Sequence, residues 1–263
     1  MKILSYNLYG KKDVESPTPD FNKRLQNLNI TINRIIKEND IEVMCFQEVN
    51  ENNMAMVEDI SKKNNYMILD KFPMKTRTIN QYNIIAVKKD NPIKINKVTA
   101  IPHGKDNEYK NINEQVIDYG MSDYRTTIFV NLEYNNKTYL IGNVHTDYKS
   151  SEGIVKGMIK SLNYMDKIKA DYKIILGDMN MTPIGEEAKE IIRQNNNYDI
   201  IFKDDIIQNS YHGYGINKAV NVDFAFVEKN ISKNCSYKII SQKEINDEGS
   251  DHRPILLTLE DYD

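Results

Sequence analysis

Residues 172–183 read YKIILGDMNMTP, an apolar run that ends in Gly177 and is followed at once by Asp178 and Asn180. The run 172–176 is rich in β-forming residues and is predicted to be an interior strand. A carboxylate and a carboxamide therefore stand two residues apart at the carboxyl end of a strand. In an extended segment such residues point to the same side, so we expect both side chains to face one ligand.

The rest of the chain alternates between predicted strands and helices. Helical spacing of apolar residues is clearest at 21–37, and further helices are predicted at 51–63, at 153–169 and after Pro183. Period-two or apolar β-forming runs predict strands at 2–9, 41–47, 66–70, 82–88, 93–101, 124–133, 137–145, 172–177, 222–228, 236–241 and 254–259. The polar segment 103–120 is predicted to be a surface loop. No repeat or linker interrupts this order, so residues 1–263 are expected to form a single domain.

Composition is that of an ordinary globular protein. Hydrophobic residues make up 40% of the chain, charged residues 28%, and the net charge is −3, so no global charge attracts polyanions. The two cysteines cannot form a disulfide framework, and Cys45, in an apolar run, is expected to be a buried thiol. The N-terminus is too polar for a signal peptide, and no apolar run reaches membrane-spanning length. We therefore expect a cytoplasmic monomer without stable membrane insertion.

Polar residues stand at the ends of many predicted strands. They are Asn7, Glu48, His145, Asp178 with Asn180, and Asp251 with His252. Each alone has an ordinary explanation, because strand-end residues often form turns and Asp178 could cap the next helix. Asp223 differs, because it is predicted to lie inside the apolar strand 222–228, where an unpaired charge is costly. It therefore needs a partner, and His252 is the predicted one.

In this order, the residues resemble the motifs of the endonuclease/exonuclease/phosphatase superfamily, the group built around DNase I. The matching stretches run from residue 5 to residue 256 and read SYNLYG, CFQEV, YRTTIFVNL, GNVHTD, ILGDMNMTP, YHGYGINKAVNVDFAFV and GSDHRPI. The resemblance implies an α/β fold, a four-layer α/β sandwich in which two stacked mixed β-sheets are flanked by helices. It also implies a metal-dependent phosphoesterase site at one edge of the sheets.

Candidate metal ligands are oxygen donors at the strand ends. Such hard ligands favour Mg²⁺, with Mn²⁺ possible, over Zn²⁺, because no Cys/His cluster competes. Glu48 is the carboxylate best placed to hold the ion, with Asn7 beside it and Asp251 as a further ligand. A metal on a phosphoryl oxygen would stabilise the charge that grows in the transition state.

The resemblance also assigns catalytic roles. By the family pattern, Asp178 orients or deprotonates the attacking water, and Asn180 holds that water or a phosphate oxygen. Asp223 and His252 resemble the family's Asp–His pair, in which the aspartate fixes the tautomer and raises the imidazole pKa. His145 resembles a second active-site histidine that donates to the phosphate or the leaving group.

Three further residues are candidates for substrate binding. Arg125, with Tyr124, stands where the family often places a phosphate-facing arginine or tyrosine. A solvent-exposed salt bridge is an equally good explanation for Arg125. His212 lies in YHGYG, which resembles a T-F-H-G-F segment of bacterial members. It is expected either to line the cleft or to serve as a tight-turn residue.

Two classes of substrate stay open. The first interpretation is a phosphodiesterase or nuclease acting on nucleic acid, with Arg125 and the lysines of 71–75 and 103–120 supplying positive charge. The second is a phosphatase or phosphodiesterase for a small molecule or lipid headgroup, as in sphingomyelinase-like members, which the acidic net charge favours slightly. Tyr9 is a departure, because abasic-site endonucleases usually carry an aspartate there. A non-catalytic binding module is disfavoured, since every expected catalytic position is filled.

Overall fold

The computed structural model describes residues 1–12, 18–90, 92–202, 209–215, 218–240 and 248–260. The strands are β1 (Lys2–Asn7), β2 (Val43–Val49), β3 (Tyr66–Ile68), β4 (Tyr82–Lys88), β5 (Lys94–Pro102), β6 (Thr126–Tyr134), β7 (Lys137–His145), β8 (Tyr172–Asp178), β9 (Tyr198–Ile201), β10 (Asp223–Glu228), β11 (Cys235–Ile239) and β12 (Ile255–Leu259). The helices are α1 (Phe21–Asn39), α2 (Met54–Lys63), α3 (Ser151–Lys167) and α4 (Glu186–Gln194), with short 3₁₀ turns at Gly213–Gly215 and Ser232–Asn234.

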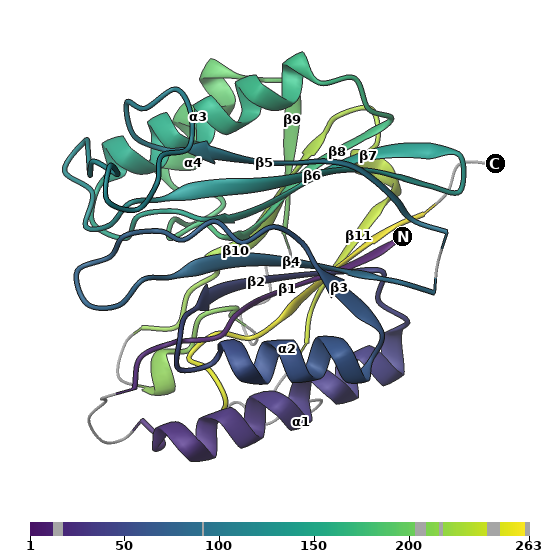
Figure 1. Cartoon of the computed structure of the whole chain (residues 1–263). Coiled ribbons are helices and arrows are strands. Elements are labelled where there is room, and N and C mark those ends of the chain that lie inside the picture. The colour runs from purple at the N-terminus through teal and green to yellow at the C-terminus, as the bar shows by residue number, and fades with distance from the viewer. Residues whose placement is uncertain (13–17, 91, 203–208, 216–217, 241–247, 261–263) are drawn as a thin grey trace.

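The strands form two six-stranded sheets, ordered β11-β12-β1-β2-β4-β3 and β5-β6-β7-β8-β10-β9. In each sheet one central pair is parallel, β1 with β2 and β7 with β8, and the other neighbours are antiparallel. The sheets stack face to face, with α1 and α2 outside the first sheet and α3 and α4 outside the second (Figure 1). The predicted four-layer α/β sandwich is therefore confirmed.

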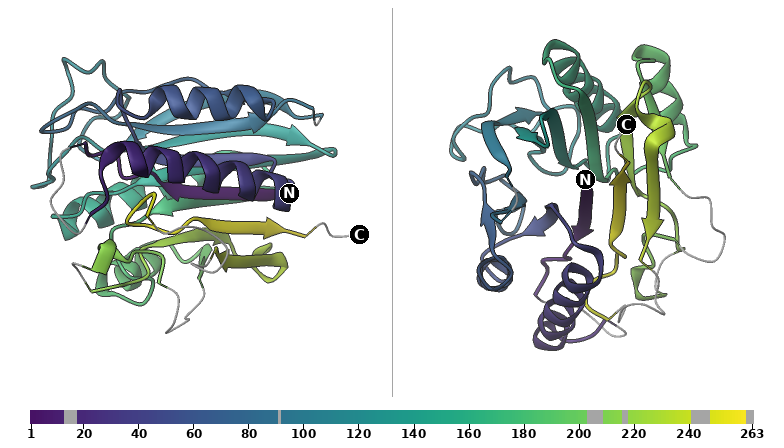
Figure 2. Two further views of the ribbon diagram at one scale, coloured as in Figure 1. Left: turned by 90° about the horizontal axis from the view of Figure 1, so that it is seen from below. Right: turned by 90° about the vertical axis from the view of Figure 1, so that its right-hand side faces the viewer.

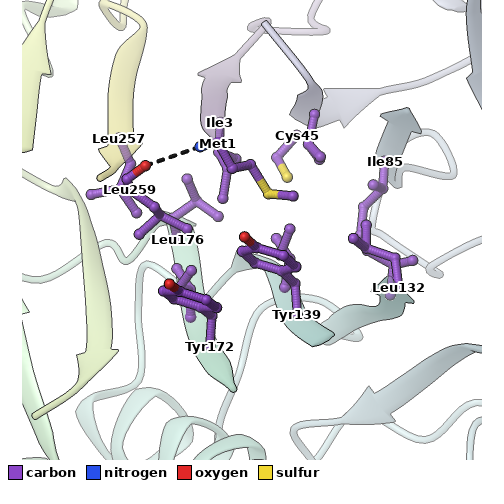
Figure 3. Close-up of a cluster of buried hydrophobic side chains, with 14 of the residues drawn as sticks. Met1, Ile3, Cys45, Ile85, Leu132, Tyr139, Tyr172, Leu176, Leu257 and Leu259 are labelled. Carbon is purple, nitrogen blue, oxygen red and sulfur yellow. Dashed lines mark hydrogen bonds between the residues drawn. The ribbon is translucent and has the colours of Figure 1, made fainter. Parts of the chain in front are cut away.

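Three apolar layers hold the sandwich together. The middle layer fills the space between the sheets and includes Met1, Ile3, Leu176, Leu257 and the buried thiol of Cys45 (Figure 3). A second layer joins the first sheet to α1 and α2, and a third joins the other sheet to α3 and α4. Each sheet therefore buries both faces, which explains why strands such as β8 read as continuous apolar runs.

Helix α1 shows how the local sequence sets an outer layer. Asp20 caps its start by accepting a hydrogen bond from the Lys23 amide at 3.0 Å. Leu28, Ile32 and Ile35 lie on the buried face, as the one-sided spacing predicts. The helix runs beside α2 along the outer face of the first sheet (Figure 2).

A polar contact links the two sheets inside the apolar middle layer. Gln47 of β2 donates from Nε2 to Asn143 Oδ1 of β7 at 2.7 Å, and both residues are fully buried. Asn143 Nδ2 in turn donates to the carbonyl oxygen of Phe46 at 3.0 Å. Because buried amides must be paired, this contact specifies how one sheet sits on the other, close to the strand ends.

Several predicted boundaries differ from the structure. Strand β1 stops at Asn7 rather than continuing to Tyr9, because Tyr9 has a φ of 46° and turns the chain. Strand β9 was not predicted; it is four residues long and has no clear alternation. Asp223 begins β10 instead of lying inside it, although it is buried. Residue 241 of the predicted strand 236–241 lies outside the described residues.

Two further predictions can be compared with the structure. The predicted hairpin between β6 and β7 is confirmed, with positive φ at Asn135 and Asn136. The segment 103–120 contains turns and bends but neither helix nor strand. None of the helices within the described ranges is both long and apolar enough to cross a membrane.

Candidate active site

The strand ends that carry the candidate residues meet at one edge of the sandwich. The parallel pairs β1/β2 and β7/β8 each bring two carboxyl ends together. Strands β10 and β12 run antiparallel to β8 and β1, so their starting ends reach the same edge. A cavity of about 830 Å³ opens there, and of the predicted residues it is lined by Glu48, Arg125, His145, Asp178, Asn180, Asp251 and His252.

Backbone conformation at this edge is unusual. Glu48 has a φ of 54° and Asn180 a φ of 47°, values that non-glycine residues rarely adopt. Asp178 and Asn180 do line one cavity, but the predicted reason was wrong, because the chain turns after β8 instead of staying extended. Gly177 has a φ of 148°, and a Cβ there would lie 2.0 Å from the Val144 carbonyl oxygen. Only glycine fits at that position.

Asp178 is the central carboxylate of the cavity. Its Oδ2 accepts a hydrogen bond from Asn7 Nδ2 at 2.9 Å. The same oxygen lies 3.5 Å from His145 Nε2 and 3.6 Å from His252 Nε2. Burial raises the pKa of Asp178 to about 7, although the charge of His252 and the bond from Asn7 act in the opposite direction. A carboxylate with a pKa near neutrality is suited to accept a proton.

Asp223 and His252 form the pair that the sequence predicts. His252 Nδ1 lies 2.8 Å from Asp223 Oδ2, and both side chains are buried. Burial lowers the pKa of His252, but the charges of Asp223 and Asp178 outweigh it and hold the pKa well above its ordinary value. The paired imidazole is therefore a cation at neutral pH.

His145, in contrast, pairs with a cation rather than with a carboxylate. Its Nδ1 lies 3.0 Å from Nη1 of Arg125, which is itself only 3% exposed. Burial and the charge of Arg125 lower the pKa of His145 well below its ordinary value. Arg125 also bonds Asp123 through Nη2 at 3.2 Å, so its salt bridge is buried rather than solvent-exposed.

The candidate metal ligands lie together beside this group. Asn7 Nδ2 is 3.4 Å from Glu48 Oε1, and the Gly10 amide donates to Glu48 Oε2 at 3.1 Å. Asp251 Oδ1 is buried and has no hydrogen-bond partner among the described residues. Burial raises the pKa of Asp251 to about 6; the nearby charge of Glu48 acts in the same direction, and that of His252, whose Nε2 lies 3.9 Å from Oδ1, acts against it. An unsatisfied carboxylate oxygen near a second acid is what a divalent cation would neutralise.

A second set of possible ligand atoms comes from Asp178, Asp223 and His252, which lie within 4.8 Å of one another. His252 already uses Nδ1 for Asp223, and as a cation it has no lone pair for a metal. Asp178 Oδ2 already faces two imidazoles, with His145 Nε2 at 3.5 Å and His252 Nε2 at 3.6 Å. The oxygen donors around Glu48 are therefore the better metal candidates.

Two predicted substrate-binding residues lie outside the cavity wall. Tyr124 is fully buried and is not among the lining residues. His212 sits in the turn before Gly213–Gly215, where its Nδ1 accepts from the Tyr214 amide at 3.3 Å. That geometry corresponds to the turn-residue explanation, and the neighbouring Tyr211 lines the cavity instead.

The sequence interpretation missed residues that support the site. Asp123 holds Arg125, and its Oδ1 accepts from the Arg77 amide at 3.0 Å, which ties a distant loop to the cavity. Asp147 accepts from the Ser122 amide and hydroxyl at 2.7 and 2.6 Å. Asp123 stands two residues before Arg125, and Asp147 stands two residues after His145. This short spacing was the sequence signal that could have identified the two acids.

Comparison with known proteins identifies the fold. No family model matches the sequence, and no curated protein matches it significantly. Among solved structures, an endonuclease/exonuclease/phosphatase from Bacteroides vulgatus is similar with a TM-score of 0.74 and 15% identity, covering 98% of both chains. The mannosyl-6-phosphatase Bt3783 of Bacteroides thetaiotaomicron gives 0.67 and 13%, covering 99% of both. Truncated Caenorhabditis elegans TDP2 gives 0.66 and 15%, covering 98% of this chain and 96% of its own.

Proposed function

We propose that this chain, which has the fold of endonuclease/exonuclease/phosphatase proteins over nearly its whole length, is a single-domain, divalent-metal-dependent phosphoesterase. One observation carries the proposal. A single oxygen of the buried Asp178 is approached by Asn7, His145 and His252, which come from three different strand ends. Such convergence of acid, base and amide in one cavity has a chemical rather than a packing rationale.

In this proposal each side chain has a separate role in hydrolysis. Asp178, with its raised pKa, takes a proton from the attacking water, and Asn180 holds that water or a phosphate oxygen. The His252 cation stabilises charge on the phosphoryl group, and Asp223 fixes its orientation through Nδ1. His145, which lines the same cavity, supplies a further donor.

A metal ion fits the remaining groups. Glu48, Asn7 and Asp251 would hold Mg²⁺ or Mn²⁺, because they are oxygen donors and Asp251 has an unsatisfied oxygen. When bound, the ion would supply Lewis-acid stabilisation of a phosphoryl oxygen.

The size of the cavity and the lysines missing from its lining favour a small phosphoester over a polymer. Among the described residues, its lining cations are Lys11, Lys12, Arg77, Arg125 and His252, and its acids are Glu48, Asp123, Asp178 and Asp251. None of the lysines of 71–75 and 103–120, which were expected to bind nucleic acid, is among the residues that line it, and Lys71 pairs with Glu58 at 2.6 Å. The cavity volume of about 830 Å³ lies in the usual range for small-ligand pockets. A protein of similar fold is a phosphatase for a sugar phosphate.

Product release from a substrate panel tests the proposal. The full chain with Mg²⁺ or Mn²⁺ would be assayed on sugar phosphates, nucleoside monophosphates, a small phosphodiester, sphingomyelin vesicles, plasmid DNA and RNA. We expect metal-dependent turnover of a small phosphoester, with little dependence on salt. Cleavage of plasmid DNA or RNA that weakens steeply with salt would instead support the nuclease interpretation. Absence of hydrolysis on every substrate, or undiminished turnover in excess EDTA, would overturn the proposal.

A further inference from the structure

Two imidazoles face one carboxylate oxygen, but the groups behind them are of opposite charge. Both His145 Nε2 and His252 Nε2 lie within 3.6 Å of Asp178 Oδ2. Behind His252, Nδ1 meets the Asp223 carboxylate, which only accepts hydrogen bonds when ionised. Behind His145, Nδ1 meets the guanidinium of Arg125, which only donates.

This contact determines where His145 carries its proton. A guanidinium stays protonated in proteins and offers no lone pair, so His145 Nδ1 must accept the bond at 3.0 Å. The proton of a neutral imidazole then resides on Nε2, the atom that points toward Asp178. A second proton on Nδ1 would place an N–H against an N–H and two cations in contact. The lowered pKa of His145 agrees with this assignment.

Arg125 is held in place by contacts that do not involve His145. Its Nη2 donates to Asp123 Oδ2 at 3.2 Å, and its Nη1 lies 3.4 Å from Gln81 Oε1. Asp123 is itself fixed, because the Arg77 amide donates to its Oδ1 at 3.0 Å. The guanidinium is thus oriented before it meets the imidazole, as a group that positions another should be.

We propose that Arg125 is a positioning residue that fixes His145 as the neutral Nε2–H tautomer. His145 then serves as a hydrogen-bond donor to the phosphoryl group and keeps its proton. The use of this donor rests on the proposed function, whereas the tautomer itself does not.

Nuclear magnetic resonance can read the tautomer without substrate. The chain has four histidines, so proton–nitrogen correlation spectra of protein carrying isotope-labelled histidine can be assigned by substituting each in turn. We expect His145 at neutral pH to show a protonated Nε2 and an unprotonated, hydrogen-bonded Nδ1. Arg125→Met should produce a tautomer mixture, and Arg125→Lys, which keeps a donor-only cation, should retain most of the Nε2–H form. A protonated Nδ1 on His145 in the unsubstituted protein would overturn the assignment.

A double-mutant cycle separates positioning from direct substrate contact. If a phosphoester is hydrolysed, Arg125→Met should lower kcat by about tenfold or more through loss of an oriented donor. In a His145→Ala background the same substitution should cost almost nothing further, because Arg125 acts through the imidazole. Arg77→Met is the matched control, since the Arg77 side chain also lines the cavity, no hydrogen bond or ion pair joins it to His145 among the described residues, and the backbone amide that bonds Asp123 is kept. Its effect should be the same with and without His145→Ala. If the losses of kcat from Arg125→Met and His145→Ala were additive, the proposal would be contradicted. If the unsubstituted protein hydrolysed no phosphoester but His145 showed the expected tautomer, only the proposed function would be contradicted.

Discussion

Asn7 and Asp178 join the two sheets at the candidate site, where Nδ2 of the amide donates to Oδ2 of the carboxylate at 2.9 Å. Asn7 is the last residue of β1 in one sheet, and Asp178 is the last residue of β8 in the other. The geometry of the site therefore depends on how the sheets stack, and not on either sheet alone.

Replacing Asn7 tests that dependence. Asn7→Ala removes the donor to Asp178 and a group beside Glu48, so we expect kcat to fall by about 100-fold, the typical cost of one oriented polar group. Steady-state kinetics on a substrate found in the panel would measure the loss. Asn52→Ala, in the same cavity lining, is the control and should stay near full activity. Equal, small effects of both substitutions would show that the inter-sheet contact has no catalytic consequence.

The candidate metal site predicts a binding event that needs no substrate. Glu48→Gln removes the charge best placed to hold Mg²⁺ or Mn²⁺, so calorimetric titration should show affinity lowered by at least about tenfold, the lower end of the range for disturbed metal sites. Thermal unfolding in EDTA should change little, because Glu48 lies at the cavity edge. Glu51→Gln changes a nearby exposed carboxylate and should bind metal normally. Unchanged metal affinity in Glu48→Gln would show that other residues bind the metal.

Asp223→Asn tests the charge on His252. The amide keeps the size of the carboxylate but removes the negative charge 2.8 Å from Nδ1, so the pKa of His252 should fall and the imidazole should lose its cationic form at neutral pH. Resonance shifts of His252 would report the change directly, and kcat should fall with it. Asp199→Asn on the adjacent strand β9 is a matched control that leaves His252 charged. An unchanged His252 together with full activity would rule out the pairing.

Much of the fold was predictable because its signals are local. Strand β8 is an apolar run closed by a glycine, and the buried residues of α1 repeat with helical spacing. The short strand β9 was missed because it lacks alternation and is defined by pairing with β10. The turn at Asn180 was also missed, since its positive φ depends on surrounding contacts such as its bond to the Thr146 carbonyl at 3.0 Å.

The candidate site likewise has features that the sequence predicts and features that it does not. Asp223 and His252 could be paired from sequence because a buried charge demands a partner. Tyr124 was predicted to bind substrate because it stands, with Arg125, where the family often places a phosphate-facing arginine or tyrosine. Successive residues at a strand start face opposite sides, however, and its ring is buried outside the cavity lining. The bond between Arg125 and His145 joins the residue before β6 to the last residue of β7, and no spacing rule reveals it.

His103 predicts how folding stability depends on pH. It is fully buried, and its Nε2 lies 2.9 Å from Thr127 Oγ1. Burial, helped by the charges of Arg125 and Lys160, lowers its pKa to about 3. In the unfolded chain the pKa is near 6.5, so unfolding takes up a proton between these values. Stability is therefore fully present above a pH of about 6.5 and falls as the pH drops toward about 3.

His103→Gln isolates this contribution. The variant keeps a polar side chain that cannot be protonated, so its free energy of unfolding should fall less steeply with decreasing pH than that of the unsubstituted protein. The difference between the two slopes should approach 1.4 kcal/mol per pH unit, or about one proton, below a pH of about 6. Urea unfolding at a series of pH values measures both slopes, and carboxylates common to the two proteins cancel in the difference. Parallel curves over the whole range would contradict the prediction, because they would mean that His103 is protonated as readily in the folded protein as in the unfolded chain.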